Sequence, residues 1–132
     1  MIVAHKPNVV DSSAWLAYLS NESGAAHFAT AIEDTPRLVV PTICLLEVFR
    51  IVARQRGERD ALQATVAMVQ GTVFDLDAEL ALAAARLGAV HKLPLADSIV
   101  YATTQRVGGI LWTQDADFSG LPDVRYIPKS SG

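Results

Sequence analysis

The sequence predicts a three-layer α/β/α domain in which helices cover both faces of a central parallel sheet of about five strands. Short apolar runs alternate with longer helical segments along the chain. The runs lack the polar–apolar alternation of half-exposed strands, which indicates strands buried on both faces. The chain has 132 residues, of which 51% are hydrophobic, so one domain spanning residues 1–132 with a single core is expected.

The expected strands are the short apolar runs that end at turn-forming or charged residues. The first run follows Pro7 and Asn8 and ends at Asp11, and Pro41 ends the second run. No internal repeat or domain linker interrupts this pattern. The five strands are expected at residues 9–11, 38–40, 72–76, 110–112 and 124–127.

The expected helices begin after residues that can cap a helix and end near glycine or a turn. Ser12 or Ser13 is expected to cap the first helix, Thr42 the third, and Asp77 a long alanine-rich helix. Residues 128–132 are expected to form a flexible tail. The helices are expected at residues 14–19, 25–33, 43–55, 59–69, 78–91 and 96–107.

The composition excludes several classes of protein. A formal net charge of −3 argues against binding nucleic acid through bulk positive charge. A nuclease stays possible, because a bound metal ion reverses the local charge of an acidic site. No apolar stretch is long enough to span a membrane, and Pro7 and Asn8 interrupt any signal-peptide pattern, so a cytoplasmic protein is expected. The single cysteine, Cys44, is expected to be a buried apolar side chain.

Four acidic residues lie where the predicted topology can bring them together. Sites in open parallel sheets form outside the carboxyl ends of the strands. Asp11 ends the first strand, and Asp115 follows the strand at 110–112. Glu47 lies in the helix after the second strand, and Asp97 lies in the first turn of the last helix. We therefore expect all four side chains to point to the same edge of the sheet.

Taken singly, three of these acids have ordinary structural explanations. Asp11 fits a strand-end cap, Asp97 a helix N-terminal acid, and Asp115 a turn residue. Glu47 differs, because its neighbours make that helix apolar nearly all round, and a buried carboxylate is costly without a partner. A divalent cation offsets both the desolvation and the mutual repulsion. Oxygen ligands favour Mg²⁺ or Mn²⁺ over zinc.

Other polar residues beside the acids are weaker candidates. Ser13 and Thr113 could hydrogen-bond a carboxylate or a bound water, although a helix cap is the favoured role for Ser13. Asp117 is either a further site residue or a loop residue beside Phe118. Two tryptophans, Trp15 and Trp112, lie in apolar surroundings and are expected in the core or an interface.

Four stretches of the sequence resemble the PIN-domain family, in particular the toxin ribonucleases of bacterial VapBC toxin–antitoxin pairs. They occur in the family's order and together extend over almost the whole chain. The family's four acids fall on Asp11, Glu47, Asp97 and Asp115. Thr42, where many relatives have serine, is a departure of little consequence. The matching stretches are residues 9–13, 45–48, 93–102 and 111–118.

The resemblance implies a metal-dependent endoribonuclease that hydrolyses RNA with a metal-activated water and acts as the toxin of a toxin–antitoxin pair. The four acids would be both the catalytic residues and the ligands of Mg²⁺ or Mn²⁺. A homodimer and a cognate antitoxin protein are implied as well. A cluster of arginines at the end of the Glu47 helix is usually a solvated face, and it is also a candidate contact to RNA phosphates. The cluster is Arg50, Arg54 and Arg56, with Arg59 after them.

The antitoxin is expected to block the acidic site with an arginine, whose guanidinium matches carboxylate oxygens. Its apolar residues are expected to enter a groove lined by Trp15, Leu16 and Leu46. A homodimer is also favoured by the residues, because helices at 14–33 and 43–68 carry more apolar side chains than one sheet face can cover.

Four other functions fit parts of the sequence. The chain could be a PIN nuclease that is not a toxin, or a PIN module that only binds RNA. A structure-specific DNA nuclease usually has long insertions, which this chain lacks. A phosphoacceptor receiver domain would use Asp75 or Asp77 with Lys129, but Asp11 is not followed by a second acid as such domains require.

Overall fold

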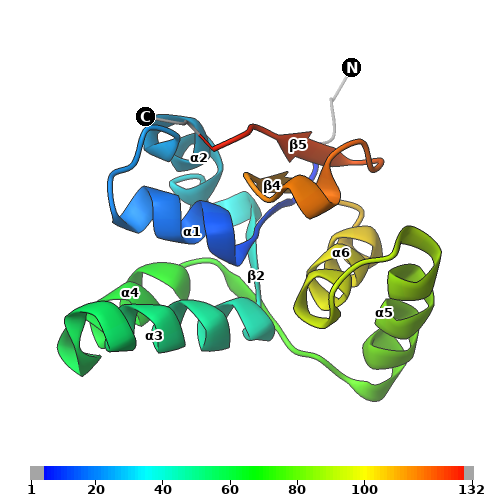
Figure 1. The fold of residues 1–132 in the computed structure, drawn as a ribbon, viewed down its shortest axis with the longest axis horizontal. Helices are drawn as coiled ribbons and strands as arrows, with labels where there is room; N and C mark the ends of the chain where they lie inside the picture. The colour runs from blue at the N-terminus through cyan, green and yellow to red at the C-terminus, as the bar shows by residue number, and fades with distance from the viewer. Residues whose placement is uncertain (1–4, 130–132) are drawn as a thin grey trace.

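The computed structural model describes residues 5–129, which form a five-stranded parallel sheet flanked by helices (Figure 1). The order of the strands is β3-β2-β1-β4-β5, so β1 lies at the centre. This architecture confirms the predicted fold class and the number of strands. The strands are β1 (Asn8–Val10), β2 (Leu38–Pro41), β3 (Thr72–Phe74), β4 (Ile110–Thr113) and β5 (Val124–Tyr126).

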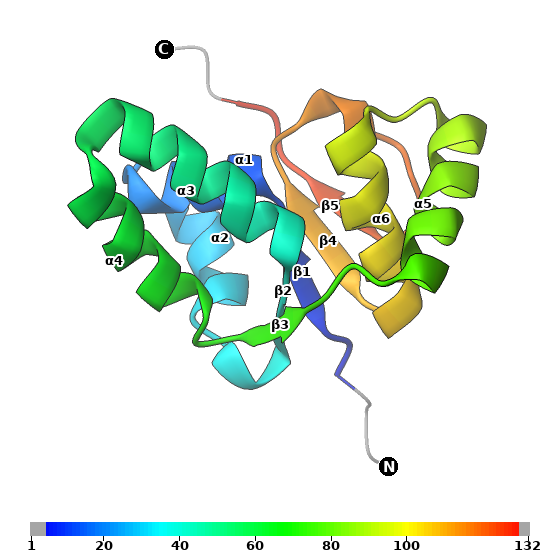
Figure 2. The same ribbon diagram turned by 90° about the horizontal axis from the view of Figure 1, so that it is seen from below.

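The helices are divided between the two faces of the sheet. Helices α1 to α4 lie on one side and α5 and α6 on the other, as Figure 2 shows. Parallel crossover connections share one hand, so the chain covers one face from β1 to β3 and the other on its return to β4. The helices are α1 (Ser12–Leu19), α2 (Ala25–Ile32), α3 (Thr42–Arg56), α4 (Glu58–Met68), α5 (Ala78–His91) and α6 (Leu95–Val107).

The core is built on the central strand. Val9 and Val10 of β1 are completely buried, and Trp15 of α1 and Phe28 of α2 are fully buried on the face that these helices cover. The Trp112 indole nitrogen of β4 donates a hydrogen bond of 3.0 Å to the Asn8 amide oxygen of β1. The expected burial of Cys44, Trp15 and Trp112 is confirmed.

Two helix caps differ from those expected. The α1 cap is Asp11, not Ser12 or Ser13, because its extended backbone (φ −77°, ψ 172°) lets its carboxylate accept from the Ala14 amide. The α3 cap is Pro41, with Thr42 as the first helical residue and no side-chain capping bond. Asp77 caps α5 as expected, accepting from the Leu80 amide.

Short 3₁₀ turns complete the chain, η1 (Thr35–Arg37) before β2 and η2 (Ala116–Phe118) after β4. The predicted third strand is shorter than expected and ends at Phe74. The expected tail at 128–132 lies, from residue 130 onward, outside the described residues. Within residues 5–129, none of the helices combines the length and apolar character that a membrane crossing requires.

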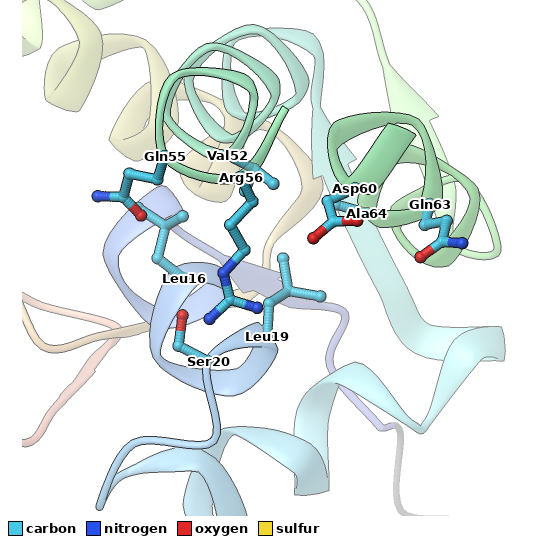
Figure 3. A pocket seen from close by; sticks show the side chains of 9 residues that line it. All are labelled: Leu16, Leu19, Ser20, Val52, Gln55, Arg56, Asp60, Gln63 and Ala64. Carbon is cyan, nitrogen blue, oxygen red and sulfur yellow. The ribbon is translucent and has the colours of Figure 1, made fainter. Parts of the chain in front are cut away.

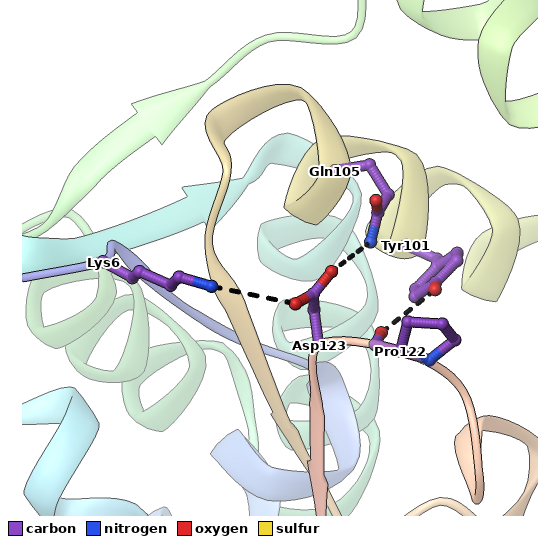
Figure 4. Close-up of polar contacts among 5 residues, drawn as sticks. All are labelled: Lys6, Tyr101, Gln105, Pro122 and Asp123. Carbon is purple, nitrogen blue, oxygen red and sulfur yellow. Dashed lines mark hydrogen bonds and ion pairs between the residues drawn. The ribbon is translucent and has the colours of Figure 1, made fainter.

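The loop between η2 and β5 is fixed by contacts to two other segments (Figure 4). The Tyr101 hydroxyl of α6 donates to the Pro122 carbonyl at 3.0 Å, and the Gln105 amide donates to Asp123 Oδ2 at 3.4 Å. The Lys6 ammonium, just before β1, lies 3.9 Å from Asp123 Oδ1. These contacts hold the end of the segment that leads into β5.

Candidate metal centre

The structure brings all four predicted acids to one cleft. Asp11 follows the end of β1, Glu47 lies on α3, Asp97 on α6, and Asp115 follows β4. The cleft has a volume of about 210 Å³ and lies beside the carboxyl ends of the central strands. Its remaining lining residues are Ser12, Ser13, Leu16, Ile51 and Val100.

Asp11 is the most deeply buried of the four acids, with 4% of its surface exposed. Its Oδ1 accepts from the Ser13 hydroxyl at 2.8 Å and from the Ala14 amide at 3.0 Å. Its Oδ2 accepts from the Thr113 hydroxyl at 2.7 Å. Burial raises the pKa of Asp11 to about 6, although the hydrogen bonds from Thr113, Ala14 and Ser13 lower it. The carboxylate is thus oriented by donors but still lacks a compensating positive charge.

Thr113 links two of the acids. Its hydroxyl donates to Asp11 and accepts a 2.9 Å hydrogen bond from the Asp115 backbone amide. Ser13 donates to Asp11 rather than capping the helix, so both weaker candidates touch a site acid. Thr113 is completely buried, which leaves its hydroxyl few other orientations.

Ser12 is a site residue that the sequence analysis treated only as a possible cap. Its hydroxyl donates to Glu47 Oε1 at 2.7 Å, joining α1 to α3 across the cleft. The signal in the sequence was its position directly after Asp11, but only the packing of α1 beside α3 shows which acid it meets.

Asp97, Asp115 and Asp117 form a tight group, in which one carboxylate oxygen from each lies within 4.8 Å of the others. Asp117 is therefore part of the acidic cluster, and its backbone amide also donates to Asp115 Oδ1 at 2.9 Å. Burial raises the pKa of Asp97 to about 8, with further contributions from the charge of Asp115, a hydrogen bond to Asp117 and the charge of Asp11. The cluster concentrates negative charge, and no cation among residues 5–129 forms an ion pair with it.

A divalent cation fits this donor set. None of the ion pairs among residues 5–129 involves an acid of the cleft. The side-chain donors are carboxylate and hydroxyl oxygens, which suit Mg²⁺ or Mn²⁺. Hydrogen bonds from Ser12, Ser13 and Thr113 hold the carboxylates in place, as outer-shell partners of metal ligands do.

The three candidate arginines lie outside the acidic cleft. Arg50 and Arg54 are exposed on α3. Arg56 lies at the end of α3, where its side chain extends toward Leu19 and Ser20 of α1 in a neighbouring pocket (Figure 3). Their contact with RNA stays a prediction.

The sequence belongs to the PIN domain family, because the family's model matches residues 9–124. No curated protein matches the sequence significantly.

Solved structures show the same fold. A toxin–antitoxin complex from Klebsiella pneumoniae matches with a TM-score of 0.75 and 23% identity over 89% of this chain and 95% of that chain. The sarcin–ricin-loop-cleaving toxin VapC20 of Mycobacterium tuberculosis matches with a TM-score of 0.75 and 20% identity, covering 89% and 96%. DNA-bound VapBC from Salmonella typhimurium matches with a TM-score of 0.72 and 14% identity, covering 93% and 98%.

In the metal-free protein, we expect Asp97→Asn to raise the melting temperature near pH 8. The pKa of Asp97 is about 8 in the folded protein against an ordinary value of 3.8, so the folded state binds more protons between these values. The contribution of the Asp97 carboxyl to the free energy of unfolding is then most favourable below about pH 4 and is lost as the pH rises to about 8. Asparagine keeps the shape of the side chain without the charge, so it should flatten this decline.

The measurement is thermal unfolding in EDTA across this pH range. The matched control is Asp75→Asn, which removes an exposed carboxylate outside the cleft and should leave the decline unchanged. A lower melting temperature for Asp97→Asn near pH 8 would show that repulsion does not destabilise the site.

Proposed function

We propose that this protein is a metal-dependent endoribonuclease and the toxin of a toxin–antitoxin pair. The observation that carries the proposal is the convergence of Asp11, Glu47, Asp97 and Asp115 in one cleft of a PIN domain, without a cation from residues 5–129 to balance them. The similarity of fold to VapC20, a toxin that cleaves the sarcin–ricin loop, supports RNA as the substrate class.

The residues of the cleft have separable roles in this proposal. Asp11, Glu47, Asp97 and Asp115 would hold Mg²⁺ or Mn²⁺, which supplies a Lewis acid for the phosphodiester and lowers the pKa of the attacking water. Ser13 and Thr113 orient Asp11, and Ser12 orients Glu47, so the carboxylates need little rearrangement to act. Attack by water at the phosphorus needs no serine nucleophile, and it leaves a 5′-phosphate and a 3′-hydroxyl when the bond from phosphorus to the 3′ oxygen breaks.

We expect Asp97→Asn to reduce RNA cleavage roughly a thousand-fold, because loss of one ligand removes about 4 kcal/mol of transition-state stabilisation. EDTA should abolish cleavage, and Mg²⁺ or Mn²⁺ should restore it in the wild type. Cleavage of a labelled RNA is the measurement, with Asp75→Asn as the control that keeps full activity. Cleavage in excess EDTA, or undiminished cleavage by Asp97→Asn, would contradict the proposal.

Two alternatives are less well supported. A PIN module that only binds RNA needs no complete set of acids, whereas all four lie in this cleft. The receiver-domain alternative conflicts with the family match and with the strand order, which is 3-2-1-4-5 here and 2-1-3-4-5 in flavodoxin-like folds. Asp77 caps α5, and Asp75 and Asp77 do not line the acidic cleft.

The proposed antitoxin would compete with the metal through an arginine that pairs with the acids. Support comes from the solved complexes of the same fold, which include VapBC-1 from nontypeable Haemophilus influenzae. One part of the expected groove was wrong, because Trp15 is completely buried and cannot touch a partner. A groove beside the site, here named the apolar groove, is lined by Leu16 as expected, whereas Leu46 does not line it. Its other large apolar residues are Leu19 of α1 and Val52 of α3, and polar side chains such as Arg56 and Asp60 line the rest (Figure 3).

Expression of the protein alone should arrest bacterial growth. Co-expression with the cognate antitoxin, the expected product of the neighbouring gene, should restore growth. Asp11→Ala should be harmless, because it removes an acid of the cleft. Growth curves for the three strains, with immunoblots to confirm equal protein levels, provide the test. If the folded, active nuclease is harmless alone, the toxin assignment fails while the nuclease assignment stands.

We also propose a homodimer. The expected surplus of apolar side chains is present on only part of the predicted surface. All large apolar side chains of α1 and α2 are at least partly buried, whereas Leu62 and Val66 on α4 and Val69 just after it are exposed. Exposed apolar surface of this kind commonly marks an interface between subunits.

Light scattering should give about twice the chain mass of 14.2 kDa at micromolar concentration. A mass near 14.2 kDa at that concentration would contradict the dimer.

A further inference from the structure

A second hollow, here named the amide pocket, adjoins the acidic cleft. It has a volume of about 240 Å³ and shares three lining residues with the cleft: Ser13, Leu16 and Ile51. A polymer bound at the acids can therefore extend along the protein surface into the amide pocket. The other residues that line the amide pocket are Ser20, Glu22, Gln55, Gln114 and Lys129.

The chemistry of the lining changes between the two hollows. The cleft presents carboxylates, whereas the amide pocket presents two glutamine amides, serine hydroxyls, one carboxylate and the ammonium group of Lys129. Amides offer a donor and an acceptor side by side, which is the pattern that the edges of nucleobases match. Lys129 adds a positive charge within an otherwise acidic surface, as contact with a phosphate requires.

Gln114 is firmly placed relative to the acids. It lies in the chain between Thr113 and Asp115, and only 8% of its surface is exposed. Its amide nitrogen donates to the Ser13 carbonyl at 3.4 Å, and its backbone amide donates to the Ser13 hydroxyl at 3.4 Å. Ser13 in turn donates to Asp11. The position of the Gln114 amide is thus coupled to the acid at the centre of the site.

The hydrogen-bonding capacity of Gln114 is only partly used. Within residues 5–129, its side-chain nitrogen makes one long bond, and no donor is hydrogen-bonded to its Oε1. This oxygen is not among the solvent-inaccessible polar atoms that lack a partner, so it keeps access to solvent, and the Gln114 residue lines the amide pocket. Gln55, which is exposed on α3, lines the same pocket.

We propose that the amide pocket binds the base of a nucleotide next to the phosphodiester that is cleaved, and so sets the sequence preference of the enzyme. Gln114 and Gln55 contact the edge of the base, and Lys129 contacts a backbone phosphate. This inference rests on the proposed ribonuclease function. Sequence-specific proteins commonly read single-stranded RNA through hydrogen bonds to splayed bases. A protein segment with apolar anchors is better matched by the adjoining groove of Leu19 and Val52, which shares Leu16, Ser20 and Gln55 with the amide pocket (Figure 3).

The first test compares the cleavage sites of the wild type, Gln114→Met and Gln55→Met by sequencing the 5′ ends of the products. Methionine keeps the length of the side chain and removes its hydrogen bonds. The preference for one base beside the cut should fall about tenfold, as expected when a well-formed amide–base contact is lost. Gln63→Met, in the neighbouring groove, is the matched control and should keep the wild-type preference.

The Gln55→Met variant tests the pocket even if Gln114→Met fails to fold, because Gln55 is exposed and its substitution leaves the core intact. Melting temperatures establish that each variant is folded. If the wild type cleaves RNA and both methionine variants keep its base preference, the pocket proposal is overturned and the ribonuclease stands.

The second test does not depend on cleavage. Asp97→Asn protein is titrated with short fluorescent oligoribonucleotides that carry either a base or an abasic site at each position in turn. One abasic position should weaken binding about tenfold, and Gln114→Met in the same background should remove that difference. Equal binding of all oligonucleotides overturns the proposal. If Gln114→Met weakens binding of the antitoxin and leaves RNA binding unchanged, the proposal is also overturned, and the pocket is assigned to the protein partner.

Discussion

The buried carboxylate of Asp11 is the constraint around which the site is organised. It lies at the end of the central strand, where desolvation is costly, and it is tolerated because Ser13, Ala14 and Thr113 donate hydrogen bonds to it. The same bonds cap α1 and connect β1 to β4. Since Thr113 also accepts from the Asp115 amide, the position of a second acid depends on the first.

The acids that make the site chemically useful also work against the stability of the fold. Burial, together with the crowding of the Asp97, Asp115 and Asp117 carboxylates, raises the pKa of Asp97 to about 8. A site optimised for stability would replace them, so the arrangement is better explained by function. A cation that binds only the folded state would recover stability by mass action.

The three hollows beside α1 suggest how a small domain can serve more than one partner. The acidic cleft, the amide pocket and the apolar groove all include Leu16 in their lining, so they follow one another along the interface of α1 and α3. Carboxylates suit a metal ion, amides suit a base, and the apolar side chains suit a protein segment. An inhibitor that enters from the apolar end needs to reach only a short way to the acids.

The sequence by itself determined the alternation of strands and helices, the burial of Cys44 and the four acids, because periodicity, caps and strand ends are local properties. Only the tertiary structure decided which groups meet. Ser12 reaches Glu47, Asp117 joins the acidic cluster, and Gln55 lines the same pocket as Gln114 because α1, α3 and the β4 edge pack together. Such contacts depend on strand order and helix packing, which no local pattern encodes. For the same reason, Trp15 is in the core rather than in a groove.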